Sequence, residues 1–138
     1  MEPTQEQIMQ IQMMEQEGNQ LNQQLELIEQ NVSEMNALRE SLKEIESSES
    51  DEILANIGKK IFIPVKIREK KLIVDIGQGN LVKKTIPDAI SLIEGQIGKL
   101  NQANEQVRER LGVIQQESEN LMKVFEKAQG EKEKDSKN

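Results

Sequence analysis

The apolar residues of the chain follow two periods, one typical of strands and one typical of helices. Between residues 53 and 85 apolar and polar residues alternate, and most of the apolar ones are β-branched, which is the pattern of a half-buried strand. Glycine-containing breaks at 58–59 and 77–80 separate the runs, and glycine supplies the positive φ that tight turns need. The segment 53–85 is therefore predicted to form four strands paired as two β-hairpins.

Residues 5–46 carry apolar side chains at alternating spacings of three and four, the heptad pattern of a coiled coil. Thr4 stands where the cap of this first helix is expected. One three-residue step is repeated at Leu38, which would overwind the supercoil locally. The predicted seam residues are Ile11, Met14, Leu21, Leu25, Ile28, Val32, Met35, Leu38, Leu42 and Ile45.

Residues 86–129 form a second heptad segment, and Thr85 is its expected N-cap. Its seam is Ile86, Ile90, Ile93, Ile97, Leu100, Asn104, Val107, Leu111, Ile114, Ser118, Leu121, Phe125 and Ala128. A polar residue such as Asn104 in a seam usually sets pairing register. The tail 130–138 lacks apolar residues and is expected to be disordered.

Two helices of equal length, joined by a segment that reverses the chain, favour an antiparallel coiled-coil hairpin. The fold class expected is therefore α+β, a long antiparallel coiled-coil hairpin joined by a four-stranded segment that oligomerises into a β-barrel. In this register Ile8 lies opposite Phe125, and Ile11 lies opposite Met122. Both termini then lie at the end of the helices far from the strands.

Composition narrows the possible chemistry. The chain of 138 residues has no Cys and no His, so thiol nucleophiles, thiolate metal sites and the commonest neutral-pH acid–base group are missing. We therefore expect no enzyme, no catalytic or cofactor-binding residues and no metal. No apolar run approaches the length of a membrane span, and no signal pattern opens the chain, which predicts a cytoplasmic protein without a membrane partner.

Charge is unevenly distributed along the chain, whose formal net charge is −7. Residues 1–50 contain 11 acidic and 2 basic residues, and residues 51–85 contain 4 acidic and 8 basic ones. The acidic first helix would repel phosphates, so no nucleic-acid partner is expected. Lysines in the strand segment are more simply the solvated rim of a small sheet.

Apolar residues outside the seam gather at the end of the helices far from the strands. Exposed apolar clusters usually mark interaction sites, and Met suits surfaces that accept differently shaped partners. The alternative is a slightly wider seam or a contact with a neighbouring chain. Together with their seam neighbours, these predicted tip residues are Ile8, Met9, Ile11, Met13, Met14, Leu121, Met122, Val124 and Phe125.

The strand segment is the second candidate site, because four short strands leave open apolar edges that invite pairing with other chains. The predicted assembly residues are Ile61, Ile63, Val65, Ile67, Leu72, Val74, Ile76 and Leu81.

The same segment carries a family resemblance. The runs ILANIG (53–58), FIPVKI (62–67), IVDIGQG (73–79) and VKKT (82–85), between two heptad helices, resemble the two-hairpin linker of the prefoldin alpha subunit. The resemblance covers essentially the whole chain as one prefoldin-type domain, 1–138, and the four strands match the alpha class.

The resemblance implies a chaperone subunit without cofactors. It implies a hetero-hexamer of two alpha and four beta subunits, whose hairpins close into β-barrels. It also implies ATP-independent holding of unfolded proteins at the coiled-coil tips and their delivery to a group II chaperonin. Self-association is a further expected contact. The alternative is a structural coiled-coil adaptor, or a divergent paralogue with one dedicated partner.

Overall fold

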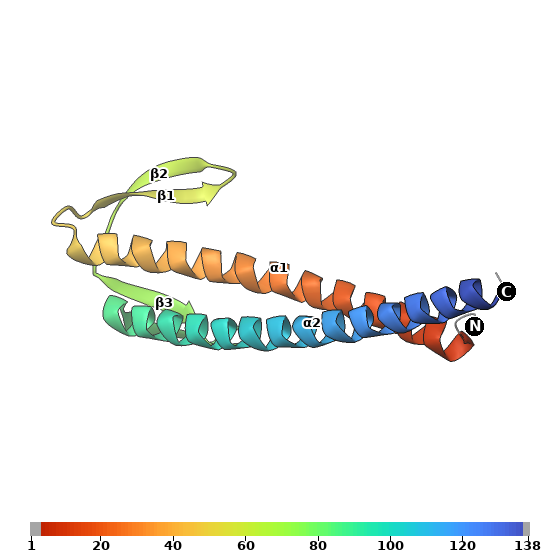
Figure 1. The fold of residues 1–138 in the computed structure, drawn as a ribbon. Coiled ribbons are helices and arrows are strands. Elements are labelled where there is room, and N and C mark those ends of the chain that lie inside the picture. The colour runs from red at the N-terminus through yellow and green to blue at the C-terminus, as the bar shows by residue number, and fades with distance from the viewer. Residues whose placement is uncertain (1–3, 137–138) are drawn as a thin grey trace. The chain divides into compact units, whose positions relative to one another are not determined.

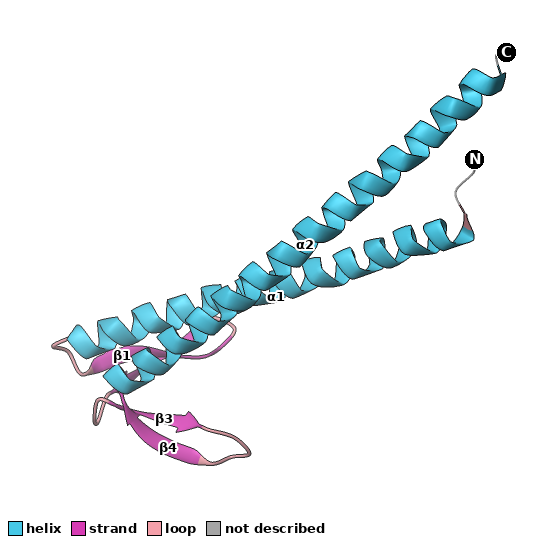
Figure 2. Cartoon of the chain, turned by 60° about the horizontal axis from the view of Figure 1, so that its bottom comes forward, coloured by secondary structure: helices cyan, strands magenta, loops and turns pink. Residues whose placement is uncertain are grey.

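The computed structural model describes the backbone of residues 4–136 and the side chains of residues 4–127. Its elements follow the predicted order, with two long helices joined by two small antiparallel β-hairpins (Figures 1 and 2). They are α1 (Gln5–Ser47), β1 (Glu52–Gly58), β2 (Ile61–Lys66), β3 (Lys71–Asp75), β4 (Leu81–Thr85) and α2 (Ile86–Ser136). The α+β fold class is therefore confirmed.

Both helices begin at the predicted threonine caps. The Thr4 Oγ1 accepts a hydrogen bond from the Gln7 amide at 3.2 Å, and the Gln7 Oε1 accepts one from the Thr4 amide at 2.9 Å. This reciprocal pair is a capping box, which satisfies two of the free amides at a helix start. At the second start, Thr85 Oγ1 accepts from the Asp88 amide at 3.2 Å.

The end of α2 differs from the prediction. The helix runs to Ser136, whereas residues 130–138 were expected to be disordered. The residues from 131 to 134 are alternating Glu and Lys, which have high helix propensity and allow a helix to continue without an apolar face. Residues 137–138 lie outside the described residues, as does the side chain of the last predicted seam residue, Ala128.

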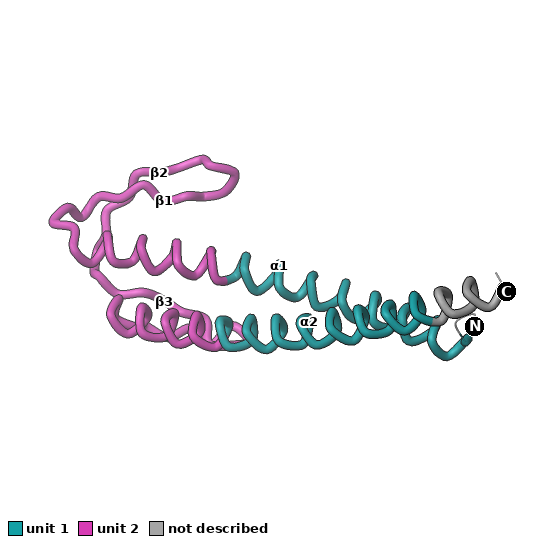
Figure 3. The backbone as a smooth tube through the Cα atoms, in the orientation of Figure 1, with its two compact units in different colours: residues 1–31, 100–138 teal, residues 32–99 magenta. Residues whose placement is uncertain are grey.

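The chain divides into two compact units, each containing a stretch of both helices (Figure 3). The first, here called the terminal unit, comprises residues 1–31 and 100–138. The second, here called the hairpin unit, comprises residues 32–99 and contains both hairpins.

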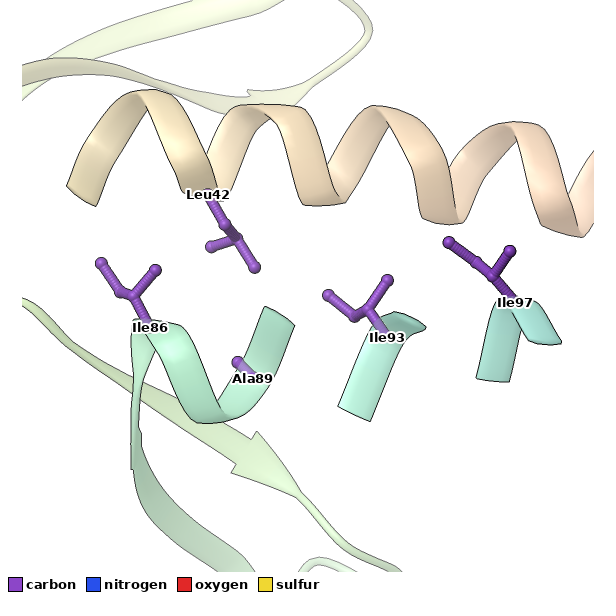
Figure 4. Close-up of a cluster of buried hydrophobic side chains, with 5 residues drawn as sticks. All are labelled: Leu42, Ile86, Ala89, Ile93 and Ile97. Carbon is purple, nitrogen blue, oxygen red and sulfur yellow. The ribbon is translucent and has the colours of Figure 1, made fainter. Parts of the chain in front are cut away.

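The core of the hairpin unit lies between the two helices. Leu42 of α1 points toward Ile86, Ala89 and Ile93 of α2 (Figure 4). These residues and Ile97 are all buried, and Ile86 is only 1% exposed. Burying an aliphatic side chain of this size contributes about 1.5–3 kcal/mol, so this cluster anchors the start of α2 against the end of α1.

The seam of α1 departs from the prediction at Leu38. Leu38 is 49% exposed, whereas the side chain of Arg39 is only 27% exposed. The seam therefore runs through Arg39 to Leu42, and the repeated three-residue step lies between Leu42 and Ile45 instead of at Leu38. The aliphatic stem of arginine can cover apolar surface. The Arg39 Nε is itself buried and makes no hydrogen bond to the described residues, and it lies 3.4 Å from the Glu40 Oε1.

Each hairpin is a separate two-stranded antiparallel sheet, as predicted. An asparagine or aspartate organises each turn in the same way: the Asn56 Oδ1 accepts from the Gly58 amide, and the Asp75 Oδ1 accepts from the Gly77 amide, both at 2.8 Å. Such side-chain turns hold the chain for reversal. The first turn then places Lys59 and Lys60 at φ angles of 48° and 62°, the left-handed region that glycine normally fills.

A lysine between the hairpins holds the end of α1. The Lys70 Nζ donates to the carbonyl oxygens of Glu46 at 3.0 Å and Ser48 at 2.8 Å. No basic residue stands in the last turn of α1 itself. Lys70 therefore supplies the cation that the negative end of a helix dipole favours.

Candidate functional site

The predicted tip residues lie in the terminal unit, on both helices. Five of them are exposed, with Met13 the most open at 64%. The exposed five are Ile8, Met9, Met13, Met122 and Val124. The other four, Ile11, Met14, Leu121 and Phe125, are partly buried. The structure thus separates a partly buried seam from an exposed apolar surface beside it, as the spacing predicted.

Two grooves run between the helices of the terminal unit. The first, here called the Glu15 groove, has a volume of about 530 Å³. Its lining is Met14, Glu15, Asn22, Leu111, Ile114, Gln115, Ser118 and Glu119. The second, here called the Glu17 groove, has a volume of about 460 Å³. Its lining is Gln10, Met13, Met14, Glu17, Glu117, Asn120 and Leu121.

These grooves bring some of the predicted residues together. Met13, Met14 and Leu121, from two helices, line the same groove, which agrees with the expected register to within about one helical turn. Among the polar lining residues, only Ser118 was named from the sequence, as a seam position, and none of them was predicted as a site residue. The sequence did contain an indication of them, because they stand next to seam positions on helices that pair with each other. Charged residues at such positions are, however, usually interpreted as solvated surface.

Two ion pairs join α1 to α2 in the terminal unit. The Arg110 guanidinium donates to both carboxylate oxygens of Glu17, from Nε at 2.8 Å and from Nη2 at 3.2 Å. These hydrogen bonds hold the pKa of Glu17 below its ordinary value of 4.5, and the positive charge of Arg110 adds to the effect. The Arg108 Nη2 donates to Glu29 at 2.8 Å, and its Nε donates to the seam residue Asn104 at 2.7 Å.

The predicted assembly residues divide into two sets. The exposed set is Ile61, Ile63, Ile76 and Leu81, and the partly buried set is Val65, Ile67, Leu72 and Val74. Leu72 packs against the core of the hairpin unit. The face of the second hairpin that carries Leu72 is therefore already covered within the chain. Four exposed apolar residues of the strands were not in the predicted set: Leu54, Ile57, Phe62 and Ile73.

The exposure of three of these missed residues, Leu54, Phe62 and Ile73, follows from strand geometry. Leu54 pairs with Pro64, and Asn56 pairs with Phe62, so these four side chains share one face of the first hairpin. Ile73 alternates with Leu72 and Val74 along β3 and points to the opposite face from them. Alternation alone could have assigned the faces, but it could not tell which face the helices would cover.

Within the part of the chain that the structure describes, no group of three or more Asp or Glu residues is placed to hold a metal ion. None of the described helices is both long and apolar enough to cross a membrane.

Comparison with known proteins gives a consistent family. The family model described as "Prefoldin subunit" matches residues 5–131. The prefoldin subunit alpha of Pyrococcus horikoshii is 31% identical over 84% of this chain and 78% of that protein. That of Methanobrevibacter smithii is 29% identical over 79% of this chain and 80% of that protein. A match at 33% identity to the alpha subunit of Methanopyrus kandleri covers 62% of this chain and 55% of that protein.

Among solved structures, the fold resembles a filamentous PFD from Methanocaldococcus jannaschii determined by cryo-EM. The TM-score is 0.70 at 16% sequence identity, and the match covers 82% of this chain and 95% of that one. At this identity the likeness concerns the fold. It supports the arrangement of two long helices joined by two small hairpins.

Proposed function

Because the chain belongs to the prefoldin family, a family of non-enzymatic chaperones, and its curated relatives are alpha subunits, we propose that it is an ATP-independent holdase. In this function it captures unfolded proteins at the apolar ends of its helices and delivers them to a group II chaperonin. The observation that carries the proposal is the exposed apolar surface of the terminal unit, formed by both helices.

The physical basis is hydrophobic burial at many weak contacts. An unfolded segment exposes apolar side chains. Binding them is favourable by about 25 cal/mol for each Å² of apolar surface that is removed from water. Methionines such as Met9, Met13 and Met122 adapt to differently shaped side chains because their thioether chains are unbranched and polarisable. Several such ends in one assembly would bind a client through multivalency.

The proposed partners are prefoldin beta subunits, further copies of this chain, unfolded clients and the chaperonin, in the cytoplasm and without nucleic acid or membrane. The hairpins support the assembly part of this proposal. Both are two-stranded, and Ile61, Ile63, Ile76 and Leu81 expose apolar surface beside their open edges. Pairing of such edges between chains would complete the sheets.

A truncation tests where clients bind. Removing residues 1–14 together with those after 117 should abolish suppression of client aggregation. The core between Leu42 and Ile97 lies outside the deleted segments, so the hairpin unit should still assemble. Full suppression of aggregation by an assembled truncation would rule out the helix ends as the binding surface.

A substitution set refines the same test. Changing Met9, Met13 and Met122 to Ser should weaken client binding, because it removes exposed apolar surface without touching the seam. The matched control changes Leu27 and Val113 to Ser, since these are exposed apolar residues of the same unit that lie away from the helix ends. Equal losses in both variants would mean that the ends have no special role.

Assembly is tested by light scattering of the chain alone and mixed with a prefoldin beta subunit. Six subunits of the size of this 15.7 kDa chain would give a mass of about 90 kDa. A mixed species of that mass that prevents aggregation without ATP supports the proposal. A lone inert chain, or one folded stoichiometric partner in place of many unfolded ones, would instead support a coiled-coil adaptor.

A further inference from the structure

The Glu15 groove combines an apolar floor with an acidic rim. Met14, Leu111 and Ile114 supply the apolar surface, and Ile114 is buried at its base with 6% exposure. One carboxylate stands on each helix, Glu15 from α1 and Glu119 from α2, and both side chains are exposed. A volume of about 530 Å³ suits a few side chains of an extended segment rather than a folded surface.

No lysine or arginine is among the eight residues that line this groove. Among the described side chains, neither Glu15 nor Glu119 forms an ion pair. Both carboxylates are therefore available to a partner. Lys123, which stands four residues after Glu119 on α2, is not within ion-pair distance of it.

The Glu17 groove has the same plan, but its charge is compensated. Glu17 already accepts two hydrogen bonds from Arg110. The negative charge of Glu117 also acts on Arg110, whose pKa is raised chiefly by its hydrogen bonds to Glu17. Arg110 thus neutralises Glu17 directly and lies near enough to Glu117 for the two charges to interact. The Glu15 groove lacks such a cation and is the one that would attract positive charge.

We propose that the Glu15 groove binds unfolded segments in which apolar residues stand beside lysine or arginine. The apolar side chains would cover Met14 and Leu111, while the cationic ends would reach Glu15 and Glu119. Lysine and arginine suit this arrangement because their stems are apolar and their charged ends can stay near water. This inference rests on the proposed function, and it specifies the client segments that the terminal unit prefers.

Labelled peptides of matched apolar content test the preference against the intact protein in its native assembly. Three peptides would alternate leucine with lysine, with serine or with glutamate, and fluorescence anisotropy would measure their affinities at low salt. Exposed ion pairs are individually weak, so we expect the lysine peptide to bind about three- to ten-fold more tightly than the glutamate peptide. The difference should shrink as added salt screens the charges.

The variant that assigns the preference to this groove is Glu15→Gln with Glu119→Gln, which removes both charges and keeps the side-chain size. It should lose most of the preference for the lysine peptide while binding the serine peptide unchanged. The matched control is Glu26→Gln with Glu105→Gln, an exposed acidic pair of the same unit that lines neither groove. The control should keep the preference.

The outcomes separate this inference from the function on which it rests. Equal affinity for all three peptides, or equal loss of preference in both double variants, would overturn the proposed specificity of the Glu15 groove. The proposed holdase function would be unaffected by either result. Failure of every peptide to bind, together with no suppression of client aggregation, would overturn both.

Discussion

Arg110 of α2 holds Glu17 of α1 with two parallel hydrogen bonds, 2.8 Å and 3.2 Å long, across the helix pair of the terminal unit. Paired hydrogen bonds between a guanidinium and a carboxylate fix orientation as well as distance. The contact therefore links the two helices close to the apolar surface that we propose as the client site.

The Glu17–Arg110 pair should make stability depend on pH. Because the pKa of Glu17 is lowered in the folded chain, its stabilising effect is present above the ordinary value of 4.5 and is lost as pH falls through the lowered pKa. Glu17→Gln should therefore lower the melting temperature at pH 7, and the difference from the native chain should vanish near the acidic end of the titration. Circular dichroism melts across this range measure it.

Glu26→Gln is the control for that experiment, because Glu26 is exposed and forms no ion pair among the described residues. Its effect on the melting temperature should be small and should not follow the same pH dependence. A Glu17→Gln difference that is constant from neutral to acidic pH would show that the pair does not titrate as described.

A glycine at position 60 should stabilise the first hairpin turn. Lys60 has a φ of 62°, where a side chain costs about 1 kcal/mol relative to glycine. Lys60→Gly should raise the free energy of unfolding by about 0.5–1 kcal/mol, since part of the gain is offset by the freedom of glycine in the unfolded chain. Lys66→Gly removes the same charge from strand β2 and should destabilise instead. If denaturant titrations show that both variants lose the same free energy of unfolding, the backbone at Lys60 is not strained.

The helix core should depend most strongly on Ile86, the first residue of α2 and the most deeply buried apolar side chain described. Ile86→Ala should reduce the free energy of unfolding by about 2–5 kcal/mol, the range for deleting a buried aliphatic side chain. Leu27→Ala removes a side chain that is 61% exposed and should change it by less than about 0.5 kcal/mol. If both variants lose comparable free energy of unfolding in denaturant titrations, Ile86 does not anchor the core of the hairpin unit.

Local patterns predicted the elements well because their causes are local. Thr85 caps α2 through a hydroxyl three residues before the amide that it binds, and the sequence shows both partners. The α2 seam was identified because its spacing is regular. Leu38 was misplaced because it is apolar, whereas the geometry of a paired helix selects the neighbouring position, and the stem of Arg39 is apolar enough to fill it.

Contacts between distant segments could not be predicted in the same way. Lys70 binds carbonyls at the end of α1, more than 20 residues away in sequence, and nothing near Lys70 indicates a helix end. The acidic rim of the Glu15 groove likewise depends on which residue of α2 lies opposite Glu15. That register is decided by the whole seam, so the groove became visible only with the helices in place.

The methionines of the terminal unit should make client binding sensitive to oxidation. The chain has no Cys, His, Trp or Tyr, so methionine is its most readily oxidised side chain. Met9, Met13 and Met122 are exposed, whereas Met35 packs against the helix core. Hydrogen peroxide transfers one oxygen atom to each thioether sulfur and leaves water, and the resulting sulfoxide is polar.

Mild peroxide should therefore abolish most suppression of client aggregation while the helical circular dichroism signal stays unchanged. Peptide mass mapping should locate added oxygens at Met9, Met13 and Met122, the exposed methionines among the described side chains. A variant with Met9, Met13 and Met122 changed to Leu keeps the apolar surface without the sulfur atoms. It should hold clients before and after the same treatment. If this variant is inactivated as fully as the native chain, the loss of client holding comes from oxidation of residues other than Met9, Met13 and Met122.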